Sequence, residues 1–364
     1  MAHPRPLVAA RAFTARPRSE LCTAQGLAPI GARRSRNHRR VIDEIAIAEV
    51  RGSGLIYSAD LTDLGLHPRV VRQAIDDGLL LRLRRGVYAR APIGRELWPG
   101  ERHALMARAT LSLGSDENVA SHLSAAALHR LPLIGRWPTT VHVLKAGAPG
   151  GSSSSGITRH RVDRAPETVT IDDVVTTTLS RTLIDVASTS SLLVAVAMMD
   201  AAIRSGAVDK NHLAREIEAL GVPRRARAVW NALEFADGRS GSPGESLCRV
   251  RTWELRFQAP QLQTNVVTRL GRFDVDFDWP DARLFGEFDG KVKYTRDAYM
   301  KGRSIDEVVL DEKAREDAIR SSTGKSFIRC IWREALDPAI FGRMLDDAGV
   351  PRVRGPGRVR RPGL

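Results

Sequence analysis

The chain has 364 residues with 43% hydrophobic content, which is enough for two or three packed domains. Its formal net charge is +14, but residues 1–40 carry nine arginines and one acid, and residues 351–364 carry five arginines and no acid. Nearly all of the excess therefore lies at the two ends, so net charge is weak support for DNA binding by the rest. The three cysteines lie far apart with no CxxC pattern, which argues against a disulfide framework or a structural zinc site.

The sequence also bears on where the protein works. No apolar run reaches the roughly 18 residues that cross a membrane, and the first residues lack the apolar core of a secretory signal. We therefore predict a cytoplasmic protein without membrane association. Residues 1–40 show no helical or strand periodicity, and three interpretations stay open: a disordered segment, a basic arm that holds phosphates, or a segment upstream of a true translation start near Val41. Residues 351–364 are predicted to be a disordered basic tail.

Residues 41–95 have the pattern of a winged helix-turn-helix domain. Three short helices are expected, over residues 41–50, 58–66 and 67–78. Ser58 is the expected N-cap of the second helix, whereas Pro68 suits the first position of the third helix and Gly78 its C-terminal stop. Residues 79–90 then have the alternation of two strands around an Arg-Arg-Gly turn, which is typical of a basic wing.

Polar side chains on the third helix and on the wing predict double-stranded DNA as a partner. In a winged helix the third helix enters the major groove, and the wing lies along phosphates. The candidate base readers lie off the apolar stripe of that helix: Arg69, Arg72 and Gln73. The candidate phosphate contacts lie on the wing: Arg82, Arg84 and Arg85. The alternatives are a small helical domain with a solvated basic face, or a winged helix that contacts protein.

Residues 96–238 are predicted to form a middle α+β domain with little chemical information. Its helices are expected over residues 101–114, 121–131, 180–206 and 211–220, and its strands over 139–145 and 156–162. The Gly/Ser-rich stretch 146–156 is predicted to be a long loop inside this domain. His122 and His129 share a helix face, where packing or capping is expected rather than metal binding. Residues 232–244 are interpreted as a hinge into the last domain.

The first two thirds of the chain resemble a known family. The resemblance covers roughly residues 41–240 and depends on three segments: GLIYSADLTDLGLHPRVVRQAIDDGLLLRLRRGVYAR, SHLSAAALHRLPLIGRWPTTVHVL and TTTLSRTLIDVA. These resemble the AbiEi-like family, the antitoxin half of type IV toxin–antitoxin abortive-infection systems. The resemblance implies a DNA-binding transcriptional autorepressor, with a nucleotidyltransferase toxin as partner.

Residues 272–291 place acidic side chains where a hairpin would bring them together. Asp274, Asp276 and Asp278 alternate with apolar residues, as in a half-buried strand, and a second strand is expected over 283–289. A turn around Asp281-Ala282 sets the register of this hairpin. It places Asp276 opposite Glu287, and Asp274 opposite Asp289.

Opposed carboxylates destabilise a strand pair unless something positive lies between them. Mg²⁺ is commonly held in this way, by one or two carboxylates with water and substrate phosphate. The hairpin therefore indicates a Mg²⁺ site at Asp276 and Glu287. The alternative is an exposed acidic face whose charges point into water.

Residues 241–336 resemble the Vsr-like branch of the PD-(D/E)xK nuclease superfamily. The matching residues are Glu245 in GSPGES, VDF at 275–277, ExDG at 287–290, and a later helix and strand in EKAREDAIRSSTGK and SFIRCIW. The resemblance implies a restriction-endonuclease-like α/β domain over residues 239–350. It also implies DNA cleavage with Mg²⁺ or Mn²⁺.

The resemblance also assigns roles to single residues. Asp276 and Glu287 would bind the metal, and Glu245 would assist from its helix. The lysine that the superfamily places two residues after the Glu is here Asp289, which becomes a candidate ligand or general base. Lys291, two residues further on, is the expected substitute for that lysine.

Two functional hypotheses follow for this multidomain α+β and α/β chain. In the first, the winged helix recruits a Mg²⁺-dependent endonuclease to DNA, in a toxin–antitoxin or phage-defence context. In the second, the chain is an AbiEi-like regulator or antitoxin whose nuclease-like domain is catalytically inactive. The acidic pair Asp276 and Glu287 favours the first hypothesis, and the missing lysine favours the second.

Overall fold

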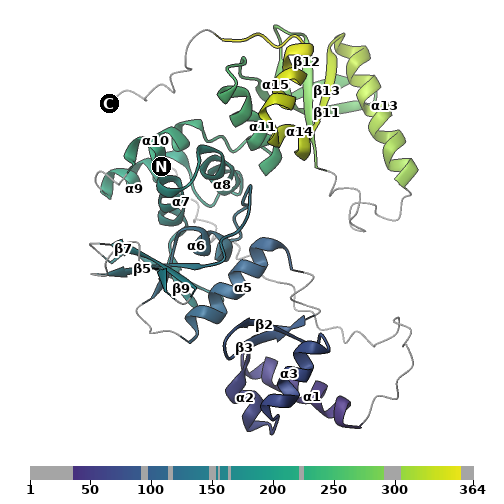
Figure 1. Ribbon diagram of the computed structural model, residues 1–364. Coiled ribbons are helices and arrows are strands. Elements are labelled where there is room, and N and C mark those ends of the chain that lie inside the picture. Colours follow the sequence, from purple (N-terminus) through teal and green to yellow (C-terminus); the bar gives the residue numbers. More distant parts are fainter. Residues whose placement is uncertain are drawn as a thin grey trace, which may run out of the picture. The chain divides into compact units, whose positions relative to one another are not determined.

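The structure is a computed structural model that describes residues 36–91, 97–113, 118–146, 153–154, 156–162, 165–220, 225–290 and 305–353 (Figure 1). The predicted disorder of residues 1–35 and 354–364 and the role of Lys291 lie outside these residues. The chain divides into two compact units, Met1–Glu96 and Leu97–Leu364, and each is described by itself. Among the described helices, none is both long and apolar enough to span a bilayer.

The first unit packs three helices against a small antiparallel sheet. The helices are α1 (Arg36–Arg51), α2 (Ser58–Asp63) and α3 (Pro68–Asp76), and the strands are β1 (Ile56–Tyr57), β2 (Leu80–Arg84) and β3 (Val87–Arg90). The strand order is β1-β3-β2. Ile45, Leu61, Val71 and Leu80 meet in one apolar core, because each element turns its buried positions inward. The unit has the predicted winged helix-turn-helix arrangement, with β2 and β3 as the wing.

Two details of the first unit correct the sequence prediction. α1 begins at Arg36 rather than Val41, and an i,i+4 ion pair between Arg40 and Glu44 at 2.7 Å supports this earlier turn. Ser58 is not an N-cap: the cap position of α2 is Tyr57, and the Ser58 amide donates to the Gly86 carbonyl at 2.9 Å. The backbone of Ser58 is thus used to hold α2 against the wing turn.

The second unit begins with a six-stranded sheet and two helices. The helices are α5 (Pro99–Leu111) and α6 (His122–Leu128), and the strands are β4 (Val119–Ala120), β5 (Val141–Ala146), β6 (Ser153–Ser154), β7 (Ile157–Val162), β8 (Thr168–Ile171) and β9 (Val174–Thr177). The strand order is β6-β7-β5-β4-β9-β8, and β5 and β7 run parallel as neighbours. The stretch between β5 and β7 therefore connects strands of one sheet, as predicted, but Ser153–Ser154 form strand β6 and pair with β7 instead of belonging to a loop.

Four helices follow this sheet and share a core. They are α7 (Leu179–Thr189), α8 (Leu192–Arg204), α9 (Lys210–Ala219) and α10 (Ala226–Phe235). Met198 and Met199 are fully buried in this core. The single helix predicted over 180–206 is wrong, because the chain breaks between α7 and α8. There the Ser191 hydroxyl accepts from the Val194 amide at 3.4 Å and caps α8, which starts a new helix.

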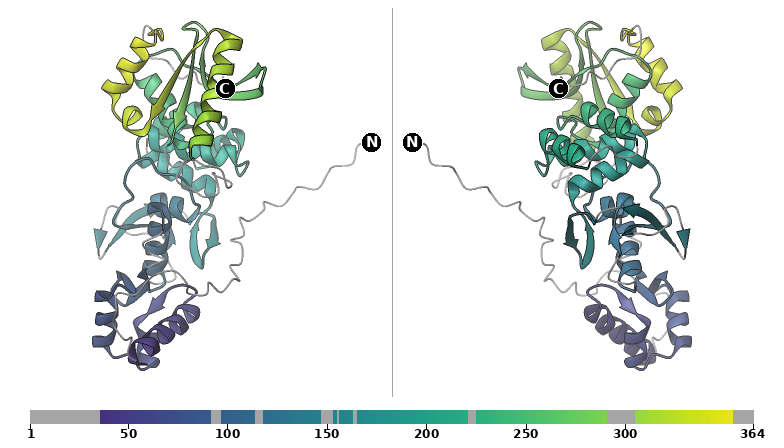
Figure 2. Two further views of the ribbon diagram at one scale, coloured as in Figure 1. Left: turned by 90° about the vertical axis from the view of Figure 1, so that its right-hand side faces the viewer. Right: turned by 90° about the vertical axis from the view of Figure 1, so that its left-hand side faces the viewer.

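The C-terminal domain places a four-stranded mixed sheet between helices (Figure 2). Its elements are α11 (Pro243–Glu254), β10 (Gln261–Thr268), β11 (Gly271–Trp279), β12 (Leu284–Asp289), α13 (Ile305–Thr323), β13 (Ser326–Ile331), α14 (Trp332–Leu336) and α15 (Pro338–Asp347). The strand order is β10-β11-β12-β13, antiparallel except for the parallel pair β12–β13. Ile319 of α13 packs with one set of strand residues, and Leu247 of α11 and Phe341 of α15 pack with another.

The predicted hairpin register is confirmed. Phe277 pairs with Gly286 and Trp279 with Leu284, which is the register that brings Asp276 and Glu287 opposite each other. The Arg283 amide donates to the Pro280 carbonyl at 3.0 Å, so Asp281 and Ala282 form the centre of the turn. Gly286 is required here, because an added Cβ would lie 2.8 Å from the Trp279 ring.

The interpretation of residues 232–244 as a hinge is not supported. Val250 of α11 is buried in the core of the four-helix group, and Ala197 of α8 is buried in the core of the C-terminal domain. A continuous apolar core therefore crosses the predicted boundary. This continuity explains why Leu97–Leu364 behaves as one compact unit.

Candidate functional site

The third helix of the first unit presents polar side chains to solvent. Arg69, Arg72 and Gln73 are exposed on α3, whereas Val71 and Ala74 face the core. The Gln73 amide nitrogen donates to a carboxylate oxygen of Asp77 at 2.8 Å. The structure therefore places all three predicted base readers on one accessible helix, with Gln73 already oriented by a neighbour.

The wing carries the predicted phosphate contacts. Arg82 and Arg85 are exposed, and Arg84 is half-buried at an irregularity in the pairing of β2 with β3. Gly86 forms the turn with a φ of +81°. Arg90 of β3 lies 2.8 Å from a carboxylate oxygen of Glu49, which joins the wing to α1.

The position that starts α3 was not singled out from sequence. His67 is the N-cap of α3, and its ring nitrogen accepts from the Arg69 amide at 3.3 Å. His67 is exposed at the end of the helix that carries the base readers. The His67-Pro68 dipeptide was an available signal for this cap, because proline is common at the first position of a helix.

A second group of polar side chains, the acidic site, comprises Glu245, Asp276, Glu287 and Gln263. Glu245 belongs to α11 and is 6% exposed. The side-chain amide of Gln263 donates to Glu245 at 3.0 Å and to Asp276 at 3.2 Å, so one group from β10 bridges two carboxylates. The second oxygen of Asp276 accepts from the Phe288 amide at 2.9 Å. The site is thus built from α11 and three adjacent strands.

Gln263 was missed by sequence reasoning, and its backbone is unusual. Its φ is +51°, in the left-handed region that non-glycine residues rarely adopt within a strand. On either side of this point, the apolar side chains of β10 and β11 pack into two different cores. Val275 packs with Phe285, whereas Phe277 packs with the α11 and α15 side chains. Asp276 lies between these two cores.

Glu287 is balanced by arginines from α13 and β13. Arg315 lies 2.6 Å from one Glu287 oxygen, and Arg329 lies 4.0 Å from the other. Arg315 also donates to the Asp274 carbonyl at 2.9 Å and lies over the Phe273 ring. Neither arginine was predicted, because each is distant in sequence from the hairpin that it contacts.

The carboxylates of the acidic site affect one another. Burial, followed by the negative charge of Asp276, raises the pKa of Glu245 to about 7. Burial also raises the pKa of Glu287, because the opposing effect of Arg315 is smaller. At neutral pH Glu245 therefore exchanges readily between its acid and its carboxylate form, which suits a group that transfers a proton or holds a cation through water.

Two other acids of the hairpin, Asp274 and Asp278, have partners outside this site. Asp274 is exposed and accepts from Asn265 at 2.9 Å, and Asp289 is half-buried at the end of β12. Asp278 is buried and forms an ion pair with Lys325, which lies just after the end of α13. Its charge is therefore balanced by that lysine. Across the described residues, no group of three or more His, Cys, Asp or Glu side chains is arranged to hold a metal.

Three histidines of the middle domain, His122, His142 and His160, pack together. His122 contacts the Ser121 hydroxyl at 3.0 Å, and its ring stacks on His160 with centroids 3.6 Å apart. His129 contacts the Thr177 carbonyl at 2.8 Å. Burial lowers the pKa of both His122 and His129, which fits the packing and capping roles expected from sequence.

The N-terminal part of the chain is similar to one known protein family. Residues 43–91, nearly all of the described first unit, match the AbiEi antitoxin family of transcriptional regulators. This part is therefore AbiEi-like. The match ends at residue 91, so the wider resemblance over 41–240 and the Vsr-like resemblance over 241–336 stay predictions.

Other similar proteins cover parts of the chain. Two uncharacterized Mycobacterium tuberculosis proteins, Rv2248 of strain H37Rv and MT2308 of strain CDC 1551, are each 31% identical over 135 residues, which is 34% of this chain and 50% of theirs. The chain thus spans about half the length of the curated relatives it matches. The crystal structure of the Mycobacterium tuberculosis RV2827C protein covers 57% of this chain and 78% of its own, with 15% identity and a TM-score of 0.34, too low to support an argument about fold.

Proposed function

We propose that this chain is a DNA-binding regulator of the AbiEi antitoxin kind, whose winged helix binds duplex DNA. The observation that carries the proposal is the exposed row of Arg69, Arg72 and Gln73 on α3, opposite its buried face. Arginine makes bidentate contacts with guanine, and glutamine makes them with adenine, in the major groove. The match of residues 43–91 to the AbiEi family supports the same function.

The roles of the two elements differ in this proposal. α3 enters the major groove and reads base edges, and the wing arginines Arg82, Arg84 and Arg85 contact phosphates. The hydrogen bond from Gln73 to Asp77 leaves the Gln73 carbonyl oxygen and its second amide hydrogen for an adenine edge. The family match supports a toxin as partner, and we propose a cytoplasmic nucleotidyltransferase toxin of a type IV system.

Selection of duplexes from a random pool, followed by fluorescence anisotropy, tests this function with the full chain. Affinity for the selected site should fall steeply with salt. Arg72→Ala should weaken binding, whereas Arg215→Ala, a change of an exposed arginine on α9, should leave it unchanged. An affinity that does not change with salt concentration, or no binding at low salt, would reject the proposal.

A second candidate function is phosphodiester hydrolysis at the acidic site. It is favoured by the convergence of Glu245, Asp276 and Gln263 in one hydrogen-bonded group, with Glu287 on the adjacent strand β12, directly after the last residue of that strand that pairs with β11. This candidate comes from the Vsr-like resemblance, whose matching residues lie on α11, β11, β12, α13 and β13 and at their ends.

The donor set suits a hard divalent cation. Asp276 and Glu287 offer carboxylate oxygens, the ligand type that Mg²⁺ or Mn²⁺ prefers. The pKa of Glu245 is raised mainly by burial and secondly by the negative charge of Asp276, which a bound cation would offset. Glu245 would act through water, with Asp289 as ligand or general base and Lys291 near the phosphate. A bound cation would supply an activated water and stabilise the charge of the phosphate.

The ion pair between Arg315 and Glu287 favours the alternative in which this domain grips DNA without cleaving it. Arg315 supplies at 2.6 Å the positive charge that the cation would otherwise supply. Nicking of supercoiled plasmid with Mg²⁺ or Mn²⁺ separates the two. Cleavage by the wild type that is lost in Glu287→Ala supports hydrolysis. If neither protein nicks DNA and calorimetry detects no Mg²⁺ or Mn²⁺ binding, the domain is a binding domain.

A further inference from the structure

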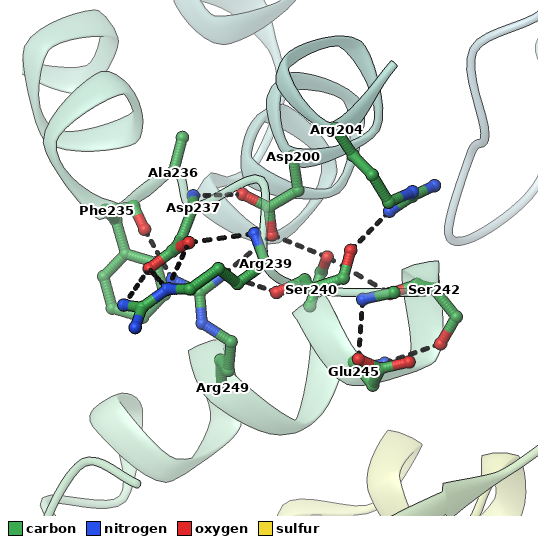
Figure 3. Close-up of polar contacts among 12 residues, drawn as sticks. Asp200, Arg204, Phe235, Ala236, Asp237, Arg239, Ser240, Ser242, Glu245 and Arg249 are labelled. Carbon is green, nitrogen blue, oxygen red and sulfur yellow. Dashed lines mark hydrogen bonds and ion pairs between the residues drawn. The ribbon is translucent and has the colours of Figure 1, made fainter. Parts of the chain in front are cut away.

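A buried carboxylate of the four-helix group reaches into the C-terminal domain. Asp200 lies on α8 and is 0% exposed. One of its oxygens accepts from the Asp237 amide at 2.6 Å, and the other accepts from the Ser246 hydroxyl and the Arg249 guanidinium, both at 2.7 Å (Figure 3). Burial raises the pKa of Asp200 against these interactions, so its partners are required to keep it charged.

Arginines from both sides fix the chain between α10 and α11. Arg249 of α11 donates to the Ser240 hydroxyl at 2.8 Å and to the Phe235 carbonyl at 2.7 Å. Arg204, the last residue of α8, donates to the Ser240 carbonyl. Gly238 lies so close to α8 that an added Cβ would be 2.8 Å from an Ile203 methyl group. We call residues 236–242 the connecting loop, and these contacts give it one position.

The connecting loop in turn holds Glu245. The Gly241 amide donates to a Glu245 carboxylate oxygen at 2.6 Å, and the Ser242 hydroxyl accepts from the Glu245 amide at 3.2 Å (Figure 3). The approach is close: a Cβ at Gly241 would lie 3.0 Å from the other Glu245 oxygen. Displacement of the loop would therefore move the carboxylate of Glu245 relative to Gln263.

We infer that Asp200 is a positioning residue of the acidic site, because it fixes the connecting loop whose Gly241 amide orients Glu245. The middle domain thereby completes a site whose other groups lie in the C-terminal domain. The inference rests on the proposed hydrolysis for its activity readout, but the hydrogen bonds can be tested without it. Asp200 touches no substrate and acts through the loop alone.

Amide hydrogen exchange in the full chain measures separately the hydrogen bond of Asp200 to the loop and the hydrogen bond of the loop to Glu245. The Asp237 amide reports the bond to Asp200, and the Gly241 amide reports the bond to Glu245. Asp200→Asn offers one acceptor oxygen to three donors, so exchange at both amides should rise by about tenfold or more. Arg239→Ala is the matched control, since Arg239 is an exposed cation of the same loop whose ion pair is with Asp237. Both amides should stay protected in the control.

Gly241→Ala is the second variant, and it serves if Asp200→Asn fails to melt cooperatively. It leaves the Asp200–Arg249 pair intact, so the Asp237 amide should stay protected while exchange of the amide at position 241 rises. Loss of protection at Asp237 without loss at Gly241 in Asp200→Asn overturns the inference. So does unchanged exchange at position 241 in Gly241→Ala.

Plasmid nicking with Mn²⁺ adds the functional readout. If the wild type cleaves, Asp200→Asn and Gly241→Ala should each lower kcat by about tenfold or more with little change in KM for DNA, because misplacement affects the reacting groups and not the winged helix. A kcat equal to that of the wild type overturns the positioning role. If the wild type does not cleave, the hydrolysis proposal fails, and the exchange measurements alone decide the inference.

Discussion

The arginines of the winged helix and the carboxylates of the acidic site differ in their relation to the fold. Arg69, Arg72 and Arg85 extend into water, so their charges cost little to place. Glu245 and Glu287 are confined in a site where burial raises the pKa of both. The exposed arginines can therefore be replaced without affecting stability, whereas replacement of these buried carboxylates alters stability and chemistry together.

The largest effect of a single substitution is expected at the acidic site. Asp276→Asn should lower plasmid nicking by roughly 100-fold or more, the scale seen when a group that stabilises developing charge is removed. Binding of duplex DNA, measured by anisotropy, should stay unchanged because the winged helix is intact. Equal losses of nicking and binding would show that the acidic site itself holds the DNA.

Two carboxylates of the acidic site, Glu287 and Asp276, should affect stability differently because their partners differ. Glu287→Ala should lower the melting temperature, because it leaves the half-buried Arg315 without its carboxylate. Asp276→Asn should not, because it reduces repulsion with Glu245. Scanning calorimetry in metal-free buffer distinguishes them, and similar losses in both variants would contradict the assigned pairing.

On the winged helix we expect an effect confined to binding. Arg72→Ala should weaken binding to the preferred duplex by about 1–3 kcal/mol and relax its specificity. Its melting temperature should equal that of the wild type, since the Arg72 side chain is exposed. A clear loss of stability would remove the contrast between the two regions.

Glu245 should make the stability of the folded chain depend on pH. The unfolded chain loses this proton near the ordinary glutamate pKa of 4.5, whereas the folded chain keeps it up to about pH 7. The free energy of unfolding therefore falls as pH rises through this window, and the penalty is complete above it. Glu245→Gln removes the penalty, so it should stabilise by roughly 2–3 kcal/mol more at about pH 8 than at about pH 5, at about 1.4 kcal/mol per pKa unit. Denaturant titrations at both pH values measure the difference, and an equal effect at both would contradict it.

The smallest effect is expected on the wing. Arg85→Ala should weaken binding to all duplexes alike and reduce the salt dependence by about one phosphate contact. The wing should otherwise keep its structure, because Arg85 is exposed beside Gly86. A sequence-dependent loss of affinity would instead place Arg85 against base edges.

Regular patterns in the sequence were enough to predict the elements around both sites. Alternation along β11 and a turn at Asp281-Ala282 predicted the strand register, because a pleated pair allows few ways to bury Phe277 and Trp279 together. Pro68 and Gly78 likewise predicted the bounds of α3. These features depend on neighbours within a few residues.

The missing parts depend on contacts that are distant in sequence. Gln263 has the polar character expected of an exposed strand position, and nothing local indicates that its backbone turns to bring the amide between two carboxylates. Arg315 resembles any cation on a charged helix. Asp200 did carry a signal, since it is the one acid within the apolar run of α8, where a charge persists only with a partner. The sequence offered no way to identify Arg249 as that partner.

The packing of α8 against α11 determines where the protein can be divided into fragments. A protein made from residues 239–364 alone would expose the face of Val250 and leave Arg249 without Asp200, and one made from residues 97–238 would leave Asp200 without its cation. Neither fragment is a self-sufficient unit for recombination or for expression. If this C-terminal domain were exchanged between relatives, α8 would therefore have to be transferred together with it.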